Sequence, residues 1–178
     1  MSTPCSPSRP VHLWLPLSNT NMSQAEIKAA IPHRPPFLWL DEIVSHDANK
    51  IVCRKQFTGD EWFFAGHYPD DPIVPGVILC ESAMQAGAAL LALQGKSNES
   101  SAPPSVADPS LQMPVVTRMN DVRFKQIVRP GDTIEIEVAL RERLGEAYFF
   151  DAKITSAGKM AARLEFACML VAKSEATP

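Results

Sequence analysis

Residues 66–93 read GHYPDDPIVPGVILCESAMQAGAALLAL, and this stretch decides the fold of the chain. Its second part, Val77–Leu93, is rich in Ala and Leu, has no Pro and one Gly, and is predicted to be helical. Apolar residues occupy nearly every side of this helix, which predicts that other structure wraps around it. The segment is short for a membrane span, and Glu81 and Gln85 make it too polar for one.

Strand-like segments lie on both sides of the predicted helix. They are residues 37–44, 50–58, 115–128, 133–143, 147–155 and 159–172. Pro and Gly turn signals separate the later segments, which suggests a meander. Ile134, Ile136 and Val138 alternate with polar or small residues, as in a half-buried antiparallel strand. The expected fold class is α+β, with a curled antiparallel β-sheet wrapped around one long central helix.

The composition of the ends and of one internal segment defines the expected domain organisation. Residues 1–21 are rich in Pro, Ser and Asn and are predicted to be a poorly ordered N-terminal arm. Ser23 begins a Ser-x-x-Glu capping box, so a single domain is expected over 22–173. Within it, the Ser/Pro-rich segment 94–114 is predicted to be a loop insertion. Residues 174–178 form a tail.

Bulk properties exclude several classes of function. With 178 residues and 46% apolar content the chain can build one core, and a net charge of −3 gives no reason to expect nucleic acid as a partner. The cysteines Cys5, Cys53, Cys80 and Cys168 are scattered without metal-ligand spacing, so neither a metal site nor a disulfide framework is expected. Free thiols and the lack of a secretory signal pattern in 1–10 predict a cytoplasmic protein.

Three features of the quoted stretch combine into a candidate active site. His67 lies in a loop stiffened by prolines, and imidazole titrates near neutrality, so it can act as a base. Free N–H groups at the start of the helix, around Gly76 and Val77, can stabilise an oxyanion. Glu81 lies on an apolar helix, where desolvation favours its protonated, proton-donating form. This set fits removal of a proton α to a carbonyl with loss of a β-hydroxyl, and requires no cofactor.

The same residues also have a simpler interpretation. A His in a Pro-rich loop is usually structural, and one buried Glu can simply bond a neighbouring strand. Residue types alone leave both interpretations open.

The wider pattern resembles the 3-hydroxyacyl-[acyl-carrier-protein] dehydratase family of type II fatty-acid synthesis. That family's signature G-H-[FY]-P-x-x-P-x-x-P-G-V, followed by E-x-x-x-Q, is filled at every position here. The run from Ile31 to Leu38 is similar to its PHR-x-PF start, and Arg123-Phe124-Lys125 and Pro130-Gly131-Asp132 are similar to later motifs. The resemblance spans about residues 23–173 and implies a hotdog fold.

The resemblance implies dehydration of (3R)-3-hydroxyacyl thioesters, carried by acyl carrier protein, to trans-2-enoyl thioesters. His67 would be the catalytic base, Glu81 the acid, and the Gly76 N–H the donor to the thioester carbonyl. It also implies a homodimer with the His and Glu contributed by opposite subunits, an acyl tunnel along their interface, and a trimer of dimers as the larger assembly. The segment 94–114 departs from the family because it lacks the aromatic residues of the usual gate.

Other residues are less specific. Arg118, Arg123, Lys125 and Arg129 form a basic cluster that could dock an acidic carrier protein or could be a solvated strand face. His33 is expected to be structural, bonding a turn.

Two alternative functions stay open. One is a hotdog acyl thioesterase, which would need no His in this loop. The other is a non-catalytic acyl-thioester-binding module.

Overall fold

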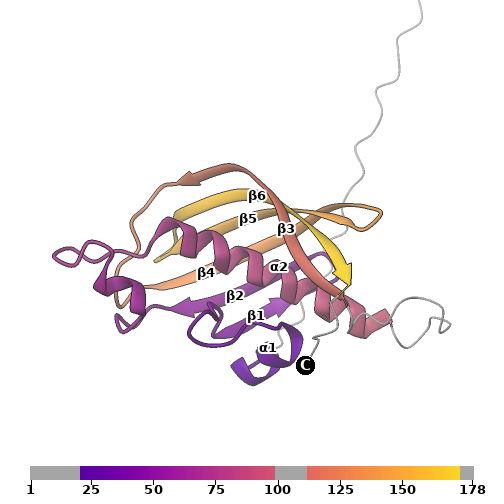
Figure 1. Cartoon of the computed structure of the whole chain (residues 1–178), viewed down its shortest axis with the longest axis horizontal. Coiled ribbons are helices and arrows are strands. Elements are labelled where there is room, and N and C mark those ends of the chain that lie inside the picture. Colours follow the sequence, from indigo (N-terminus) through magenta and orange to yellow (C-terminus); the bar gives the residue numbers. More distant parts are fainter. Residues whose placement is uncertain (1–20, 99–111, 173–178) are drawn as a thin grey trace, which may run out of the picture.

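The computed structural model describes residues 21–98 and 112–172, which form two α-helices, a short 3-10 helix and six strands (Figure 1). The helices are α1 (Gln24–Ala30), η1 (Trp62–Ala65) and α2 (Gly76–Asn98). The strands are β1 (Glu42–His46), β2 (Lys50–Gln56), β3 (Gln112–Phe124), β4 (Thr133–Leu144), β5 (Ala147–Ser156) and β6 (Lys159–Ala172). Predictions that fall on residues 1–20, 99–111 and 173–178 lie outside the described residues.

The six strands form one antiparallel sheet that curves around α2 (Figure 1). The strand order is β1-β2-β4-β5-β6-β3, and α2 contacts five of these strands. The predicted hotdog fold is therefore confirmed. The predicted meander holds for β4, β5 and β6, but β3 lies at the far edge beside β6 and not next to β4.

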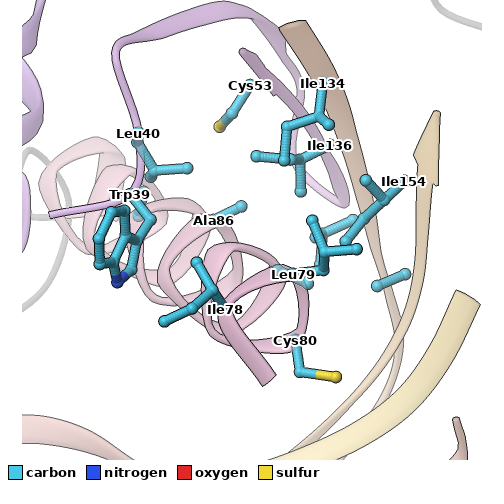
Figure 2. Packing of buried hydrophobic residues seen from close by; sticks show 14 of the residues in the cluster. Trp39, Leu40, Cys53, Ile78, Leu79, Cys80, Ala86, Ile134, Ile136 and Ile154 are labelled. Atoms are coloured by element: carbon cyan, nitrogen blue, oxygen red, sulfur yellow. The ribbon is translucent and has the colours of Figure 1, made fainter. Parts of the chain in front are cut away.

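The core lies between α2 and the concave face of the sheet. It contains buried residues of α2, such as Ile78 and Leu79, and the aliphatic residues Ile134 and Ile136 of β4 (Figure 2). On β4 the predicted alternation is present, because Ile134, Ile136 and Val138 are fully buried while the acidic residues between them are not. Residues 76–95 are long and apolar enough to cross a membrane by length and composition alone, yet 56% of the window is buried inside this structure. That burial is the property of a core helix.

Gly87 lets α2 pack closely against the sheet. A Cβ atom at this position would lie 2.8 Å from Cζ of Phe166 on β6. The Phe166 ring is itself stacked on Phe150 of β5, with 4.9 Å between ring centroids, and both side chains are buried. The helix thus lies directly on an aromatic pair of the sheet, and a side chain at position 87 would push them apart.

The helix α1 anchors the segment that leads to the sheet. The backbone N–H of Ser23 donates to Oε2 of Glu26 at 2.7 Å, as the capping-box pattern predicts. Ile27 is fully buried in the core, and Met22 pairs with Ile43 at the edge of β1.

The predicted strand at 37–44 is wrong in its first half, because β1 begins only at Glu42. The physical reason is the side chain of Gln85 on α2, which takes over the backbone bonds of this segment. Its Oε1 accepts from the N–H of Trp39 and its Nε2 donates to the carbonyl of Phe37, both at 2.8 Å. Residues 37–39 are therefore bonded to α2, and residues 37–41 form irregular chain before β1.

The predicted loop at 94–114 is shorter than expected. The helix α2 continues to Asn98 because no Pro interrupts it before that point, and β3 begins at Gln112. Pro114 is accommodated within β3 because β3 is an edge strand, where one missing N–H does not break the interior of the sheet.

Candidate active site

The loop that carries His67 is fixed at several points. The backbone N–H of His67 donates to the carbonyl of Phe63 in η1 at 2.9 Å, which continues that short helix. Val74 donates its N–H to the carbonyl of Val128 at 2.8 Å and ties the far end of the loop to the segment after β3. Prolines at positions 69, 72 and 75 restrict the backbone between these bonds. The imidazole is thus presented on a stiff support.

A backbone carbonyl sets the orientation of the His67 ring. Nδ1 of His67 lies 3.0 Å from the carbonyl oxygen of Ile73, and a carbonyl can only accept. Nδ1 therefore carries a proton and donates it, which leaves Nε2 of the neutral ring unprotonated and able to accept one. The His67 side chain is half-buried, and the ring of Tyr68 meets it edge-on with 4.8 Å between centroids.

The start of α2 provides the predicted free N–H groups. Ile78 and Leu79 already donate to the carbonyl of Pro75, whereas the amides of Gly76 and Val77 lie before the first internal bonds of the helix. The ring of Phe124, at the end of β3, lies over Gly76 so closely that a Cβ there would be 2.7 Å from Cζ. Gly at position 76 is what allows this approach.

Glu81 is about one and a half turns into α2, with its side chain 20% exposed. Oε1 accepts a hydrogen bond from Nε2 of Gln85 at 2.9 Å, and Nε2 of His33 lies 3.6 Å from the same oxygen. Burial lowers the pKa of His33 below the ordinary imidazole value; Glu81 acts against this effect and Arg34 reinforces it. The candidate acid therefore has a neutral imidazole beside it near neutral pH.

A cavity of about 280 Å³ opens beside the Glu81 carboxyl. Its lining is mostly apolar and comes from α2, β3 and β6 together with His33. The lining residues are His33, Glu81, Met84, Gln85, Ala88, Pro114, Val115, Val116, Phe166 and Cys168. An apolar pocket with one carboxyl in its wall can hold an acyl chain and present a proton to it.

The structure of one chain does not bring all the predicted site residues together. His67 and Gly76 lie in and after the Pro-rich loop, and neither is among the described residues that line the Glu81 cavity. His33, expected to bond a turn, lies beside Glu81, a position that the sequence analysis did not anticipate. Arg34, in contrast, does bond the turn, because its guanidinium donates to the carbonyls of Ile31 and His33. The PHR motif singled out the segment that contains His33, but it did not predict the contact of His33 with Glu81.

The predicted basic cluster is only partly available as a docking surface. Arg123 pairs with Asp121, and Arg129 with Asp71, an exposed residue whose pKa this guanidinium lowers. The Arg118 guanidinium lies 5.5 Å from the centroid of the Phe149 ring. Among the described residues Arg118 and Lys125 have no ion-pair partner, so they are the cluster members free to meet an acidic protein.

The cysteines of the described residues offer no activated nucleophile. Cys53, Cys80 and Cys168 are free and buried, and burial raises the pKa of each thiol, to about 11 for Cys168. Within residues 21–98 and 112–172, no group of three His, Cys, Asp or Glu side chains could hold a metal ion.

Comparison with known proteins gives consistent relatives. Residues 31–165 match the FabA-like domain family. The chain is 39% identical over 140 residues to the 3-hydroxyacyl-[acyl-carrier-protein] dehydratase FabZ of Clostridium perfringens, across 79% of this chain and 92% of that protein. It is 36% identical over 153 residues to the enzyme of the same name from Caulobacter vibrioides, across 85% of this chain and 90% of that protein.

A solved structure agrees on the fold. The dehydratase heterocomplex ApeI:P from Xenorhabdus doucetiae is similar with a TM-score of 0.68 at 18% identity, covering 83% of this chain and 91% of that chain. At this identity the structural likeness shows the fold alone. The sequence matches, which extend over most of the chain, show that it belongs to the FabA-like family of 3-hydroxyacyl-[acyl-carrier-protein] dehydratases.

Proposed function

We propose that this protein dehydrates (3R)-3-hydroxyacyl-[acyl-carrier-protein] thioesters to trans-2-enoyl thioesters in fatty-acid biosynthesis. The observation that carries the proposal is the bond between Nδ1 of His67 and the carbonyl of Ile73. It leaves Nε2 as a free base on a rigid loop, in a family whose curated members are named as dehydratases. A hotdog acyl thioesterase would need no His in this loop, so His67 favours the dehydratase.

In the proposed reaction Nε2 of His67 removes a proton from C2 of the acyl chain, and the electrons left there form the C2–C3 double bond. The C3–O bond breaks, and the carboxyl of Glu81 gives its proton to the departing hydroxyl, which leaves as water. General acid–base groups contribute about 10²–10⁴-fold each to such a reaction. The negative charge that develops on the thioester oxygen would be stabilised by the N–H of Gly76 at the positive end of α2.

A second copy of the chain completes the site in this proposal. The cavity around Glu81 includes neither His67 nor Gly76, so one chain supplies the acid and its partner the base. Two features support pairing of copies: β3 is an unpaired edge of the sheet, and Val115, Val116 and Met119 on it are more than a third exposed. A trimer of dimers stays a prediction from the resemblance.

The thioester would be delivered by acyl carrier protein, an acidic partner. Arg118 and Lys125 support docking near the end of β3, because no ion pair with the described acidic residues neutralises them and Phe124, next to Lys125, covers Gly76. A cytoplasmic location fits the free thiols of Cys53, Cys80 and Cys168, which persist most readily in a reducing compartment.

The test is an assay of purified protein with a short 3-hydroxyacyl thioester and with the matching trans-2-enoyl thioester. Absorbance of the enoyl group and release of free thiol are followed in the same sample. Interconversion without thiol release is expected, with His67→Ala and Glu81→Gln each losing about 10²-fold or more while remaining folded. Thiol release would instead indicate a thioesterase, and binding without turnover a non-catalytic module.

The shared site has its own test. Inactive His67→Ala and Glu81→Gln chains are unfolded together in equal amounts, refolded and assayed. If each site combines two chains, half of the dimers are mixed and each has one intact site, so activity returns to about a quarter of wild type. Continued inactivity, with mixed dimers shown by mass spectrometry, would place both residues of one site on the same chain.

A further inference from the structure

His33 lies in the wall of the cavity that holds Glu81. Its Nε2 is 3.6 Å from Oε1 of Glu81, which is close but too long for a direct hydrogen bond. Contacts of this kind are often long in a structure without substrate and tighten when the site closes. The two side chains are 29% and 20% exposed, so water screens the contact only in part.

The other nitrogen of His33 shows which way the ring donates. Nδ1 is buried and has no hydrogen-bond partner among the described residues. Nδ1 lacks a partner among these residues in either tautomer, whereas a proton on Nε2 faces the acceptor oxygen of Glu81, so the proton of the neutral ring is favoured on Nε2. Burial, the first cause of the lowered pKa of His33, keeps the ring neutral near neutral pH. The protonated nitrogen of His33 is therefore the one that lies 3.6 Å from Oε1 of Glu81.

Gln85 supplies a second donor to the same oxygen. Its amide cannot be turned around, because Oε1 of Gln85 accepts from the N–H of Trp39 and Nε2 donates to the carbonyl of Phe37. The remaining N–H on Nε2 is directed at Oε1 of Glu81, at 2.9 Å. An oxygen that faces two N–H groups is an acceptor and does not carry the proton of the carboxyl.

We infer that His33 is a positioning residue which, together with Gln85, holds Oε1 of Glu81 as an acceptor and leaves Oε2 to carry the proton to the substrate. This inference rests on the proposed role of Glu81 as the acid. The O–H bond of Oε2 breaks, its proton joins the departing hydroxyl to form water, and the resulting carboxylate keeps both donors on Oε1. The same two donors thus orient the acid before the step and stabilise its anion afterwards.

The segment that carries His33 is built to hold the ring in place. The guanidinium of Arg34 donates to the carbonyls of Ile31 and His33 at 2.8 and 2.7 Å. Phe37 donates its N–H to the carbonyl of Arg34 at 2.8 Å, and Ile31 is buried in the core. These bonds fix the turn on both sides of His33, which suits a residue that must orient another.

Few other ionisable groups line the cavity beside Glu81. Among the described lining residues these are His33 and Cys168, and burial raises the pKa of the Cys168 thiol to about 11. His33 is thus the lining residue whose substitution tests the contact with Glu81.

Two substitutions of opposite character separate positioning from packing. His33→Phe keeps a ring of similar shape but removes the N–H, whereas His33→Gln loses the ring but keeps a donor near the position of Nε2. We measure kcat and KM for both, with thermal unfolding as the check on folding. Glu81→Gln and the double variant Glu81→Gln/His33→Phe are measured beside them.

The expected result is a fall in kcat of about tenfold for His33→Phe at unchanged KM, and of less than about threefold for His33→Gln. In the Glu81→Gln background His33→Phe adds no further loss, since the two residues act as a unit.

Full activity of His33→Phe beside an inactive Glu81→Gln would overturn the role of His33 and leave the proposed function intact. The reverse order, with His33→Gln impaired and His33→Phe normal, would show that the ring of His33 matters for packing. That result would also overturn its role as a positioning residue. A wild-type protein without dehydration would overturn the proposed function and the inference with it.

Discussion

The ring of Phe124, at the end of β3, lies over Gly76, the first residue of α2, with no room for a Cβ atom between them. A Cβ at Gly76 would come within 2.7 Å of Cζ of the ring, and within 3.0 Å of two further ring atoms. This contact joins the proposed oxyanion donor to the edge strand of the sheet. The geometry at the start of α2 therefore depends on a residue far along the chain.

Gly76→Ala is expected to damage activity more than stability. The Phe124 ring is 53% exposed and can swing outward, so the free energy of unfolding should change by less than about 1 kcal/mol. The displaced ring and the added methyl group disturb the site beside the Gly76 N–H, and kcat should fall about tenfold or more. Steady-state kinetics and urea unfolding measure the two effects. Adding Phe124→Leu to the Gly76→Ala variant should recover part of kcat. Equal activity of Gly76→Ala and wild type would contradict the assignment of Gly76 to the site.

Gly87→Ala, in contrast, should lower the stability of the fold. The Phe166 ring that the new Cβ would meet at 2.8 Å is 3% exposed and stacked on Phe150, so it has no free space to enter. Overpacking of this kind costs about 1–3 kcal/mol, which outweighs the gain of up to about 1 kcal/mol from Ala in a helix. Urea unfolding measures the change. Gly66→Ala is the matched control, because nothing lies within 4 Å of a Cβ there; an equal effect of the two would refute the packing argument.

Gln85→Leu should be one of the more destabilising single changes in the chain. Gln85 is 1% exposed, and Leu at this position leaves the N–H of Trp39 and the carbonyl of Phe37 without their partner. Each unsatisfied buried group costs about 1–3 kcal/mol, so a loss of about 2–5 kcal/mol is expected. Hydrogen exchange at the Trp39 amide should accelerate in parallel. The exposed Gln56→Leu is the control, and an unchanged exchange rate at Trp39 would show that Gln85 does not hold this segment.

Native protein should protect Cys168 from alkylation. The thiolate is the reactive form, and burial raises the pKa of Cys168 to about 11, so at pH 8 about one thiol in a thousand is ionised. Protection should decrease as pH rises towards that value and disappear in urea, where the pKa returns to its ordinary range. Iodoacetamide labelling followed by peptide mass spectrometry reports each cysteine separately. Complete labelling of native Cys168 within minutes at pH 8 would contradict its burial beside the Glu81 cavity.

The sequence by itself determined the features that depend on neighbouring residues. The central helix followed from an apolar run without Pro, β4 from its period-two alternation, and α1 from a capping box at Ser23. The motif spacing also placed His67 before the helix and Glu81 within it. Such signals act over a few residues, because helix turns, strand pleats and caps are local geometry.

Tertiary structure alone decided how distant segments meet. It pairs β3 with β6, and it makes 37–41 irregular through bonds from Gln85, more than forty residues away in the chain. It also places His33 against Glu81, although the two residues look unrelated along the chain. These contacts depend on how the helix docks on the sheet, which local sequence patterns do not predict. Within one chain, the same docking leaves His67 outside the cavity of Glu81, because the loop before α2 and the middle of α2 face different surroundings.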